Sequence, residues 1–319
     1  MAQTSPFDGI RYVWMNGQLV EFAQATVHVM AHALHYGSGL FEGIRCYRTP
    51  QGPAVFRLQE HLKRLENSCK VYRMEIPFSR AELTQACFDA IRGNELEECY
   101  IRPIVYRGFG QVGINPLNSP VEVAIAVWTW GRYLGDDAIE KGVDACVSSW
   151  RRSGLGSSPA LAKATANYLN SQLIKMEAIA NGYAEGIALD SNGYVSEGSG
   201  ENIFVVQDGA VYTPPVSSSI LPGITRQSIM TLAEEAGYDV RRVAIPRGML
   251  YTCDEAFFTG TAVEVTPIRS IDRVTVGEET PGPVTRRLMT EFLDITRGRI
   301  EDRFGWLTPV PAAVAAPVA

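Results

Sequence analysis

The sequence predicts a two-domain α/β protein of the α+β type, and three observations support this expectation. Stretches rich in β-branched and aromatic residues alternate with stretches of helical periodicity along the chain. Its 319 residues are enough for two cores of ordinary size. Glycines and charged residues interrupt the pattern at 131–138, which we expect to be an interdomain loop. The predicted organisation is a small α/β domain at 1–130, a larger domain at 139–307 and a disordered tail, rich in Pro and Ala, at 308–319.

The first domain is expected to contain a hairpin, two helices and two long strands. The hairpin lies in IRYVWMNGQLV, because its Asn-Gly pair is a strong turn signal. One helix is expected in VFRLQEHLKRLENSCKVYRM, where apolar residues recur every three or four positions from Leu58 to Tyr72, until a proline ends it. A second helix is predicted at about 81–91. The segments YIRPIVYRGF and VEVAIAVWTW then predict strands.

The second domain is expected to contain four strands and two helices. The strands are VDACVSSW, GIALD, NIFVV and EAFFTG. The helices are predicted at Asn167–Ala180 and Arg226–Ala236, each followed by a glycine stop signal. Apolar spacing predicts the buried faces of the two helices, which are Leu169, Leu173, Met176 and Ala180 in the first and Ile229, Leu232, Ala233 and Ala236 in the second.

Composition and charge exclude several functional classes. The chain has 35 acidic and 29 basic residues, and no run of Lys and Arg provides the basic surface that nucleic acid needs. No apolar run approaches the ~18 residues that span a bilayer, and the first residues lack the pattern of a signal peptide. We therefore expect a cytoplasmic protein with a small-molecule partner and no membrane partner. Six widely spaced cysteines fit buried thiols in a reducing compartment, and they are Cys46, Cys69, Cys87, Cys99, Cys146 and Cys253.

Lys163 is unusual because alanines, serines and a threonine surround it in SSPALAKATAN, whereas lysine is usually exposed among other charged groups. Two further stretches contain matching chemistry. LPGITRQ places Thr225 at the start of a helix, where free N–H groups and the helix dipole attract phosphate, although Thr225 could also be a simple helix cap. FFTGTA ends a predicted strand and offers further hydroxyl and N–H donors.

Glu197 lies in SNGYVSEGSGEN, a glycine-rich stretch directly before an apolar strand. An ordinary surface turn would explain this position, but a carboxylate held at a strand edge can also pair with a cationic ring nitrogen. An isolated lysine, a phosphate cup and a fixed carboxylate are together what pyridoxal phosphate requires. The lysine binds this cofactor as a Schiff base, and the carboxylate keeps the ring nitrogen protonated.

The motifs ALAKATANYLNS, GIALDSNGYVSEGSGEN, LPGITR and TGTA, in this order, closely resemble those of the branched-chain amino acid aminotransferases. VHVMAHALHYGSGLFEGIRCY, YIRP, WGRYLG and GPVT match the bacterial members too, so the resemblance extends from about Tyr12 to Trp306. It implies the two-domain fold type IV of the D-amino acid aminotransferases, with pyridoxal 5′-phosphate bound by the domain 139–307. The implied reaction is transamination of L-leucine, L-isoleucine or L-valine with 2-oxoglutarate, giving a branched 2-oxo acid and L-glutamate. The resemblance also implies a homo-oligomer, either a dimer or a hexamer made of three dimers.

The resemblance assigns roles to individual cofactor contacts. Lys163 binds the cofactor and shuttles the proton at the substrate Cα, Tyr168 bonds the phenolic oxygen of the ring, and Glu197 faces the pyridine nitrogen. Without the resemblance, Arg64 reads as an exposed charge beside Lys63 on a helix. The full set that the resemblance places at the cofactor is Arg64, Lys163, Tyr168, Glu197, Leu221, Ile224, Thr225 and Thr261.

The substrate pocket must accept both an aliphatic side chain and the distal carboxylate of glutamate, which requires apolar walls and a recessed cation. The resemblance assigns Arg102 to that distal carboxylate, because its planar fork of donors matches a carboxylate. It assigns the α-carboxylate to Tyr100 and to the TGTA turn, with Thr261 and Ala262. The alanine and threonine that follow Lys163 differ from the Gly-Gly pair common in the family, which leaves the width of the pocket open.

The resemblance also supplies the apolar wall of the substrate pocket. Val112 and Ile114 would contribute from a neighbouring subunit, through the loop that contains them. Tyr36 and Phe41 match wall positions, although ordinary core packing would also explain these two aromatics. The wall positions in the same chain are Tyr36, Phe41, Tyr133 and Tyr168.

Three alternatives to this function remain at this point. A D-amino acid aminotransferase or an aminodeoxychorismate lyase would share the cofactor site but differ in the substrate wall, and YIRP and FEGIRCY speak against both. A non-catalytic binding protein on the same scaffold would be expected to have lost at least one residue of the cofactor set.

Three histidines raise the question of a metal site. His28, His32 and His35 are spaced by four and three residues, as metal ligands on a helix would be. However, VHVM is expected to be a strand, and no further ligand is evident in the sequence. We therefore expect no metal, and hydrogen-bonded structural histidines instead.

Overall fold

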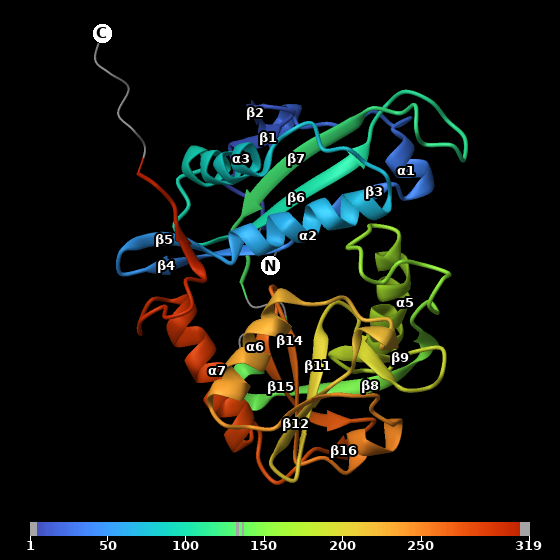
Figure 1. Ribbon diagram of the computed structural model, residues 1–319, viewed down its shortest axis with the longest axis vertical. Helices are drawn as coiled ribbons and strands as arrows, with labels where there is room; N and C mark the ends of the chain where they lie inside the picture. Colours follow the sequence, from blue (N-terminus) through green and yellow to red (C-terminus); the bar gives the residue numbers. More distant parts are fainter. Residues whose placement is uncertain (1–4, 132–133, 136, 313–319) are drawn as a thin grey trace. The chain divides into compact units, whose positions relative to one another are not determined.

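The protein, described by a computed structural model, forms two compact units (Figure 1). The first unit contains the described residues up to 130 and those from 294 onward, and the second contains 131–293. Each unit is built on one large sheet. The residues that the structure describes are 5–131, 134–135 and 137–312.

The sheet of the first unit has eight strands in the order β17-β5-β4-β6-β7-β1-β2, with β3 paired to β6. The pairs between its strands are antiparallel throughout the described residues. Helices α2 and α3 pack against each other, and α3 also contacts β1 and β7 (Figure 1). The bounds are β1 Tyr12–Met15, β2 Gln18–Glu21, η1 Phe22–Gln24, α1 His32–Tyr36, β3 Gly39–Phe41, β4 Ile44–Thr49, β5 Gly52–Phe56, α2 Leu58–Val71, α3 Arg80–Gly93, β6 Cys99–Arg107, β7 Val121–Trp128 and β17 Leu307–Pro309.

The local predictions for the first unit are confirmed. Strands β1 and β2 form the expected hairpin, and both turn residues have positive φ, 45° at Asn16 and 102° at Gly17. This is the backbone that a tight two-residue turn requires and that Asn and Gly tolerate best. The predicted apolar face of α2 is buried, with Leu58, Leu62, Leu65 and Cys69.

The C-terminal segment adds a strand to the first sheet. β17 pairs with β5, with Thr308 opposite Val55. Thr308 and Pro309 are predicted to lie in a disordered tail, but they are ordered here because β17 supplies backbone partners to the exposed edge of β5. The structure groups 294–307 with the first unit, whereas the sequence predicts them in the second domain. Residues 313–319 of the expected tail lie outside the described residues.

The sheet of the second unit has nine strands in the order β10-β9-β8-β15-β14-β11-β12-β13, with β16 paired to β15. It is a mixed sheet, because β8 runs parallel to β9 and β15, and β12 runs parallel to β13. The bounds are α4 Ala138–Lys141, β8 Val143–Arg151, α5 Asn167–Ala180, β9 Glu185–Leu189, β10 Val195–Gly198, β11 Asn202–Gln207, β12 Ala210–Thr213, η2 Val216–Ser218, α6 Ile224–Glu235, β13 Val240–Arg242, η3 Arg247–Tyr251, β14 Glu255–Gly260, β15 Glu264–Ile271, β16 Val274–Thr275 and α7 Pro283–Thr296.

Helix α5 has the predicted bounds, but its predicted buried face is wrong. Its buried residues are Ser171, Ile174 and Ala178, whereas Leu169 and Met176 are exposed. The face is set by the packing of α5 on β8 and β9, where a Cβ on Gly186 would lie 2.7 Å from Ile174 Cγ2. The glycine therefore lets the helix lie directly on the strand, and this contact decides which side of α5 faces inward.

Helix α6 begins at Ile224 and buries most of its predicted face, with Ile229, Leu232 and Ala233 fully enclosed and Ala236 only partly so. The glycines that follow α5 and α6 have positive φ, 75° at Gly182 and 86° at Gly237. Their left-handed backbone ends both helices, as predicted.

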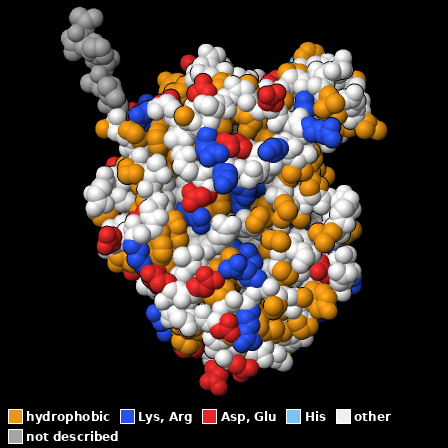
Figure 2. Space-filling model, in the orientation of Figure 1, with side chains coloured by type: hydrophobic (Ala, Val, Ile, Leu, Met, Phe, Trp, Pro, Cys, Tyr) orange, Lys and Arg blue, Asp and Glu red, His pale blue; other side chains and the backbone are white. Residues whose placement is uncertain are grey.

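Cysteines, helix length and surface charge bear on the expectations drawn from composition. All six cysteines are buried thiols without disulfides. No helix within the described ranges is both long and apolar enough to cross a membrane. On the face drawn in Figure 2, basic and acidic side chains are interspersed. Of the predicted interdomain loop, residues 132, 133 and 136 lie outside the described residues, and Ala138 begins α4.

Candidate active site

Lys163 lies in the segment between β8 and α5, and it is not a surface lysine. Its neighbours Ala162 and Ala164 are almost fully buried, which fixes the backbone on both sides. The Asn167 side chain donates to the carbonyl oxygens of Pro159 (3.3 Å) and Ala162 (3.1 Å), and so ties this segment to the first turn of α5. The small residues on either side of Lys163 thus allow the backbone of this segment to pack closely against the rest of the unit.

The Lys163 ammonium has a specific partner in the same unit. Its Nζ donates to the Tyr168 hydroxyl at 2.5 Å and lies 5.0 Å from the centre of the Tyr168 ring. Tyr168 is in the first turn of α5, one turn beyond the buried Ala164. The fold therefore brings together the amine and the phenol that the resemblance assigns to one cofactor ring.

Glu197 is buried on β10, so the interpretation of this segment as an ordinary surface turn is wrong. Its Oε2 accepts hydrogen bonds from Asn202 Nδ2 and from the Leu221 N–H, each at 3.0 Å. Its Oε1 has an ionic contact with Arg152 Nε at 3.4 Å. Burial raises the pKa of Glu197 above its ordinary value, although the charges of Arg152 and Lys163 and the Leu221 N–H partly oppose the rise.

Arg152 was not predicted from the sequence, yet it organises the turn around Glu197. Its Nη2 donates to the carbonyl oxygens of Gly198 (2.6 Å) and Ser199 (2.9 Å). Its Nη1 donates to Ser171 Oγ on α5 at 2.8 Å. The guanidinium therefore joins α5, the helix that follows the Lys163 segment, to the strand of Glu197. In the sequence, the only sign of Arg152 is the Arg-Arg pair directly after the predicted strand VDACVSSW.

Two more buried carboxyl groups, those of Glu185 and Glu201, contact the turn that follows Glu197. Glu185 Oε2 is paired with Lys175 Nζ at 2.8 Å, and its Oε1 accepts from the Ser199 N–H at 3.3 Å. Glu201 Oε2 accepts from the Gly200 N–H at 3.0 Å. Burial, and then the charge of Glu185, raise the pKa of Glu201 to about 8. This environment favours the protonated form of Glu201.

The start of α6 presents hydrogen-bond donors that suit a phosphate. The N-cap is Gly223 and no side chain caps the helix, so the interpretation of Thr225 as a simple cap is wrong. The first N–H groups of a helix lack partners within the helix and carry its positive dipole. Thr225 is buried, and its hydroxyl makes no hydrogen bond to any described residue. A Cβ on Gly223 would lie 2.0 Å from Asn202 Oδ1, so only glycine allows this close approach.

The turn after β14 provides further hydroxyl groups. Thr259 lies opposite Asn202 in the β11–β14 ladder, and its buried Oγ1 has no hydrogen-bond partner in the described part of the chain. Thr261 and Ala262 follow in a half-buried turn. Asn202 thus connects Glu197, the start of α6 and this turn. The second unit therefore holds an amine, a buried carboxyl group and unpaired hydroxyls around one junction, which is the donor set that pyridoxal phosphate requires.

Arg64, in the first unit, lies on α2 and is held by a buried carboxylate. Glu42 Oε1 accepts from Arg64 Nε at 2.7 Å, and Glu42 Oε2 accepts from Arg64 Nη2 at 2.8 Å. His61 Nδ1 also lies 2.7 Å from Glu42 Oε2. Burial raises the pKa of Glu42, but the charges and hydrogen bonds of Arg64 and His61 outweigh burial and lower it. The interpretation of Arg64 as an exposed charge is therefore wrong. Glu42 and His61 were not predicted as its partners.

Arg102 is surrounded by aromatic rings, as a cation in an apolar wall should be. Its Cζ lies 4.7 Å from the ring centre of Phe41, 5.2 Å from that of Tyr100 and 5.5 Å from that of Trp128. Its Nη2 donates to the Tyr100 hydroxyl at 3.3 Å, and its buried Nε has no hydrogen-bond partner among the described residues. A Cβ on Gly43 would lie 1.8 Å from that hydroxyl. Trp128 was not predicted as part of this group.

Tyr36 lies on α1 and is half-exposed, so core packing does not explain it. Its hydroxyl accepts from the Gly113 N–H at 3.1 Å, and His32 Nε2 lies 2.9 Å from the Gly113 carbonyl oxygen. These two contacts hold the loop that carries Val112 and Ile114, whose side chains are exposed, Ile114 by 92%. Tyr133, predicted as a further wall residue, lies outside the described residues.

The histidine segment differs from its predicted structure. VHVM forms no strand, and helix α1 begins at His32 instead. His32 Nδ1 lies 2.7 Å from Ser38 Oγ, so both ring nitrogens have partners. Among the described residues, no group of three His, Cys, Asp or Glu side chains is arranged to hold a metal ion.

A comparison with protein families identifies the class of protein. Residues 39–271 match the family described as amino-transferase class IV, which is well over half of the chain. The chain belongs to this family. The predicted resemblance and the predicted fold class, a two-domain fold of type IV, are thereby confirmed.

Individual relatives are similar over nearly the whole chain. The branched-chain-amino-acid aminotransferase of Salmonella typhimurium is 51% identical over 300 residues, which are 94% of this chain and 97% of that protein. The crystal structure of the branched-chain amino acid aminotransferase of Escherichia coli has a TM-score of 0.93 and 50% identity, and covers 95% of this chain and 100% of its own. The enzyme of the same name from Thermobaculum terrenum, solved in its PLP-form, has a TM-score of 0.88 and 35% identity, covering 95% of this chain and 99% of its own. Other similar structures with this name hold pyridoxamine 5′-phosphate, N-(5′-phosphopyridoxyl)-L-glutamate or 4-methylvaleric acid.

Proposed function

We propose that this chain is a branched-chain-amino-acid transaminase that uses pyridoxal 5′-phosphate. It transfers the amino group of L-leucine, L-isoleucine or L-valine to 2-oxoglutarate, giving a branched 2-oxo acid and L-glutamate. Relatives that bear this name are similar over more than nine-tenths of the chain. The observation that carries the proposal is the half-buried Lys163, whose Nζ bonds Tyr168 and whose charge acts on the buried Glu197.

The residues of the second unit fit the cofactor. Lys163 would hold it covalently, Tyr168 would bond the ring oxygen, and Glu197 would pair with the ring nitrogen. Thr225, Thr261 and the N–H of Ile224 at the start of α6 would hold the phosphate, and Leu221 would add a contact. In the first unit, Arg64 would contribute a guanidinium, which Glu42 keeps in one orientation. When bound, the cofactor supplies an electron sink for the negative charge that develops at the substrate Cα.

Lys163 and Glu197 have different proposed roles in proton transfer. Lys163 Nζ takes the proton from the substrate Cα and returns it later, because Tyr168 holds this amine beside the ring. Glu197 would keep the ring nitrogen protonated through its negative charge. Its Oε2 accepts from Asn202 and the Leu221 N–H, so Oε1, whose contact with Arg152 is 3.4 Å long, is the oxygen that would face the ring.

Substrate contacts are proposed for residues of each unit by itself. In the first unit, Arg102 would bind the distal carboxylate of glutamate, because its Nε has no other acceptor among the described residues. Tyr36 and Phe41 would supply an apolar wall, and Tyr100 would supply a hydroxyl for the α-carboxylate. In the second unit, Thr261 and Ala262 would offer donors to a carboxylate. This dual pocket separates the proposal from a D-amino acid aminotransferase or an aminodeoxychorismate lyase, and the retained lysine and carboxylate separate it from a non-catalytic binding protein.

The proposal includes a homo-oligomer in the cytoplasm. Two exposed apolar groups support association, one on α5 with Leu169, Met176 and Ile179, and one on the loop with Val112 and Ile114. Exposed apolar surface of this kind is costly unless another surface covers it. We propose a dimer, alone or as a trimer of dimers. The six free cysteines fit a reducing compartment.

The test is an assay of the purified protein with the cofactor. L-Leucine and 2-oxoglutarate should yield L-glutamate, whereas D-alanine should yield none. The variant Lys163→Ala should lose this activity and the visible absorbance of the bound cofactor, while its circular dichroism stays that of the wild type. Lys70→Ala, a change of another lysine at the end of α2, should behave as the wild type. Absence of glutamate from L-leucine in the wild type would reject the proposal.

A further inference from the structure

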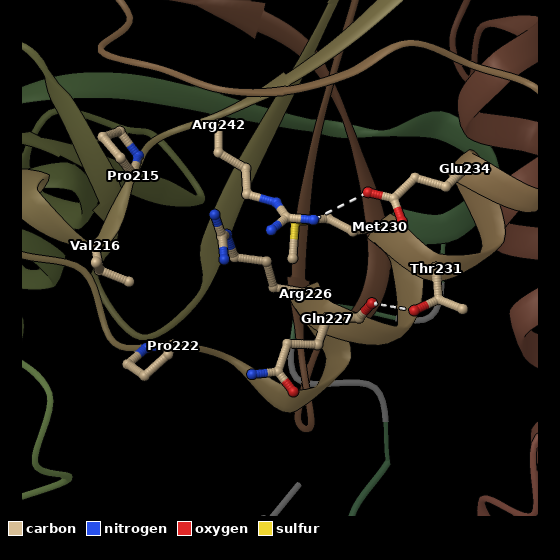
Figure 3. A pocket seen from close by; sticks show the side chains of 9 residues that line it. All are labelled: Pro215, Val216, Pro222, Arg226, Gln227, Met230, Thr231, Glu234 and Arg242. Carbon is tan, nitrogen blue, oxygen red and sulfur yellow. Dashed lines mark hydrogen bonds and ion pairs between the residues drawn. The ribbon is translucent and has the colours of Figure 1, made fainter.

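A pocket lies beside helix α6 in the unit 131–293, and its lining does not include Lys163, Tyr168 or Glu197 (Figure 3). Its volume is about 550 Å³, which is within the range of pockets that bind small organic molecules. Its apolar lining is formed by Pro215, Val216 and Pro222, and by Met230 beside the arginines (Figure 3). Two arginines, Arg226 and Arg242, also line it. The proposed cofactor site uses neither of them.

Arg226 is the buried cation of this pocket. Only 4% of the residue is exposed, and its Nε and Nη2 donate to Thr213 Oγ1 (3.0 Å) and to the Pro214 carbonyl oxygen (2.9 Å). Its Nη1 makes no hydrogen bond within the described part of the chain. Burial, and then the charge of Arg242, lower the pKa of Arg226 to about 10. The two guanidinium groups therefore lie close enough to repel each other, as Figure 3 shows.

The charges in the pocket do not balance. Arg242 is paired with Glu234 Oε1 at 3.0 Å, and both side chains are about half-exposed (Figure 3). The charge of Glu197 also reaches Arg226, but that carboxylate is already in contact with Arg152. Among the described residues that line the pocket, two arginines thus share one carboxylate, and one positive charge is left beside an apolar wall. A buried cation without an anion is costly, so the pocket favours a ligand that brings one.

We propose that this pocket binds a small aliphatic carboxylate with a single negative charge. The carboxylate bonds Arg226 Nη1 and Arg242, and the aliphatic part contacts Met230 and the two prolines. A branched 2-oxo acid has this chemistry, whereas an amino acid has no net charge and inorganic phosphate has no apolar part. Naming 2-oxo acids as the natural ligand rests on the proposed function, but the class of ligand rests on the pocket alone.

Occupation of this pocket would act on the proposed active site through α6. Arg226 directly follows Thr225, and Pro222 directly precedes the N-cap Gly223. A ligand held between Pro222 and Arg226 therefore contacts the first turn of the helix whose N–H groups are proposed to hold the phosphate. Through this turn, a 2-oxo acid made by the enzyme would alter how firmly the cofactor is held.

Calorimetry on the holoenzyme with 4-methylvalerate tests the proposal, because this carboxylate has the aliphatic part but lacks the reactive 2-oxo group. We expect two sites per chain in the wild type. Arg242→Gln should weaken one of them by roughly tenfold or more, through loss of a charge-assisted hydrogen bond. The matched control is Arg241→Gln on the same strand, whose partners are Asp239 and Tyr212, and it should keep both sites. A single wild-type site that Arg242→Gln leaves unchanged, or two sites that both stay unchanged in this variant, would overturn the proposal.

A second measurement does not depend on a variant. Crystals of the holoenzyme soaked in 4-bromobutyrate should show an anomalous bromine peak beside Met230, and a peak only near Lys163 overturns the assignment. Inorganic phosphate should not displace 4-methylvalerate from this pocket, and full displacement would mean a general anion site instead. Transamination by the same preparation is assayed separately. An inactive enzyme with an occupied pocket would reject the proposed function alone, and an active enzyme with an empty pocket would reject this inference alone.

Discussion

Arg152 lies against Glu197, with Nε 3.4 Å from Oε1, and it is held there by hydrogen bonds to Gly198, Ser199 and Ser171. The guanidinium is thus fixed by α5 and by the two residues that follow Glu197. Burial favours the protonated form of Glu197, and the charge of Arg152 is the largest opposing contribution. Arg152 therefore sets how readily Glu197 carries the negative charge that its proposed role requires.

Activity should be sensitive even to a conservative change of Arg152. Arg152→Lys keeps a positive charge but cannot bond Gly198, Ser199 and Ser171 together, because an ammonium lacks the planar fork. We expect kcat for L-leucine to fall by roughly tenfold or more, since Glu197 is then less firmly oriented. The control Arg151→Lys changes the neighbouring exposed arginine, whose Nη1 donates to the Ser191 carbonyl oxygen at 3.2 Å. Equal activities of the two variants would contradict the role given to Arg152.

Arg102 should matter more for glutamate than for leucine. Its proposed partner is the distal carboxylate, which leucine lacks. We expect Arg102→Ala to lower kcat/KM for L-glutamate by roughly tenfold more than for L-leucine, the size of a lost charge-assisted hydrogen bond. The control is Arg48→Ala, an exposed arginine of the same unit that pairs with Glu97. Similar losses for both substrates would remove the argument for a dual pocket.

Gly43 should tolerate no larger residue. An alanine Cβ there would lie 1.8 Å from the Tyr100 hydroxyl, so the ring must move away from Arg102. A displacement of about 1 Å at a substrate-binding group can lower activity on the order of 100-fold, and we expect such a loss in Gly43→Ala. Gly248→Ala is the matched control, because no atom lies within 4 Å of its added Cβ. Steady-state assays with L-leucine compare the two, and a fully active Gly43→Ala variant would disprove the contact.

The raised pKa of Glu201 predicts that the free energy of unfolding depends on pH. In the folded protein its pKa is about 8, against an ordinary value of 4.5. Between these pH values the folded state binds more protons at this position than the unfolded state, so the group lowers the free energy of unfolding as pH rises, with the full effect above about pH 8. Glu201→Gln resembles the protonated form and avoids this loss.

The expected result is a higher Tm for Glu201→Gln than for the wild type at about pH 8.5, and a much smaller difference at about pH 5. Thermal unfolding of the holoenzyme at both pH values measures it. The exposed Glu75→Gln provides the control and should show no such pattern. A Tm difference that is equal at both pH values would mean that Glu201 is charged in the folded protein.

Local features of the fold could be predicted from the sequence because neighbours in the chain determine them. The Asn-Gly turn specifies the hairpin, and the glycines after α5 and α6 specify where these helices end. The sequence also singles out Lys163, Glu197 and Thr225 as site candidates, because each lies in a short motif of unusual composition, and their proposed roles stay predictions. These features depend on spacings of a few residues.

Features that depend on distant parts of the chain were missed. Arg152 and Glu197 are separated by strand β9 and helix α5, so no local pattern links them. The buried face of α5 follows from Gly186, which lies on the strand beneath it rather than in the helix. Leu169 and Met176 satisfy the apolar spacing equally well, and only the sheet determines that Ile174 and Ala178 face inward. Arg64 was named from the family resemblance, but its partners Glu42 and His61 were not predicted.

The pairing of β17 with β5 gives the polypeptide an order of assembly during its synthesis. The segment 131–293 is continuous, so all strands of its sheet have left the ribosome while β17 is still inside. Strands β1 to β7 of the first sheet precede the second unit in the chain, but the edge of β5 stays open until β17 has emerged. A nascent chain from which β16 has emerged but β17 has not therefore carries one finished sheet and one open edge, which is the form that chaperones would have to protect.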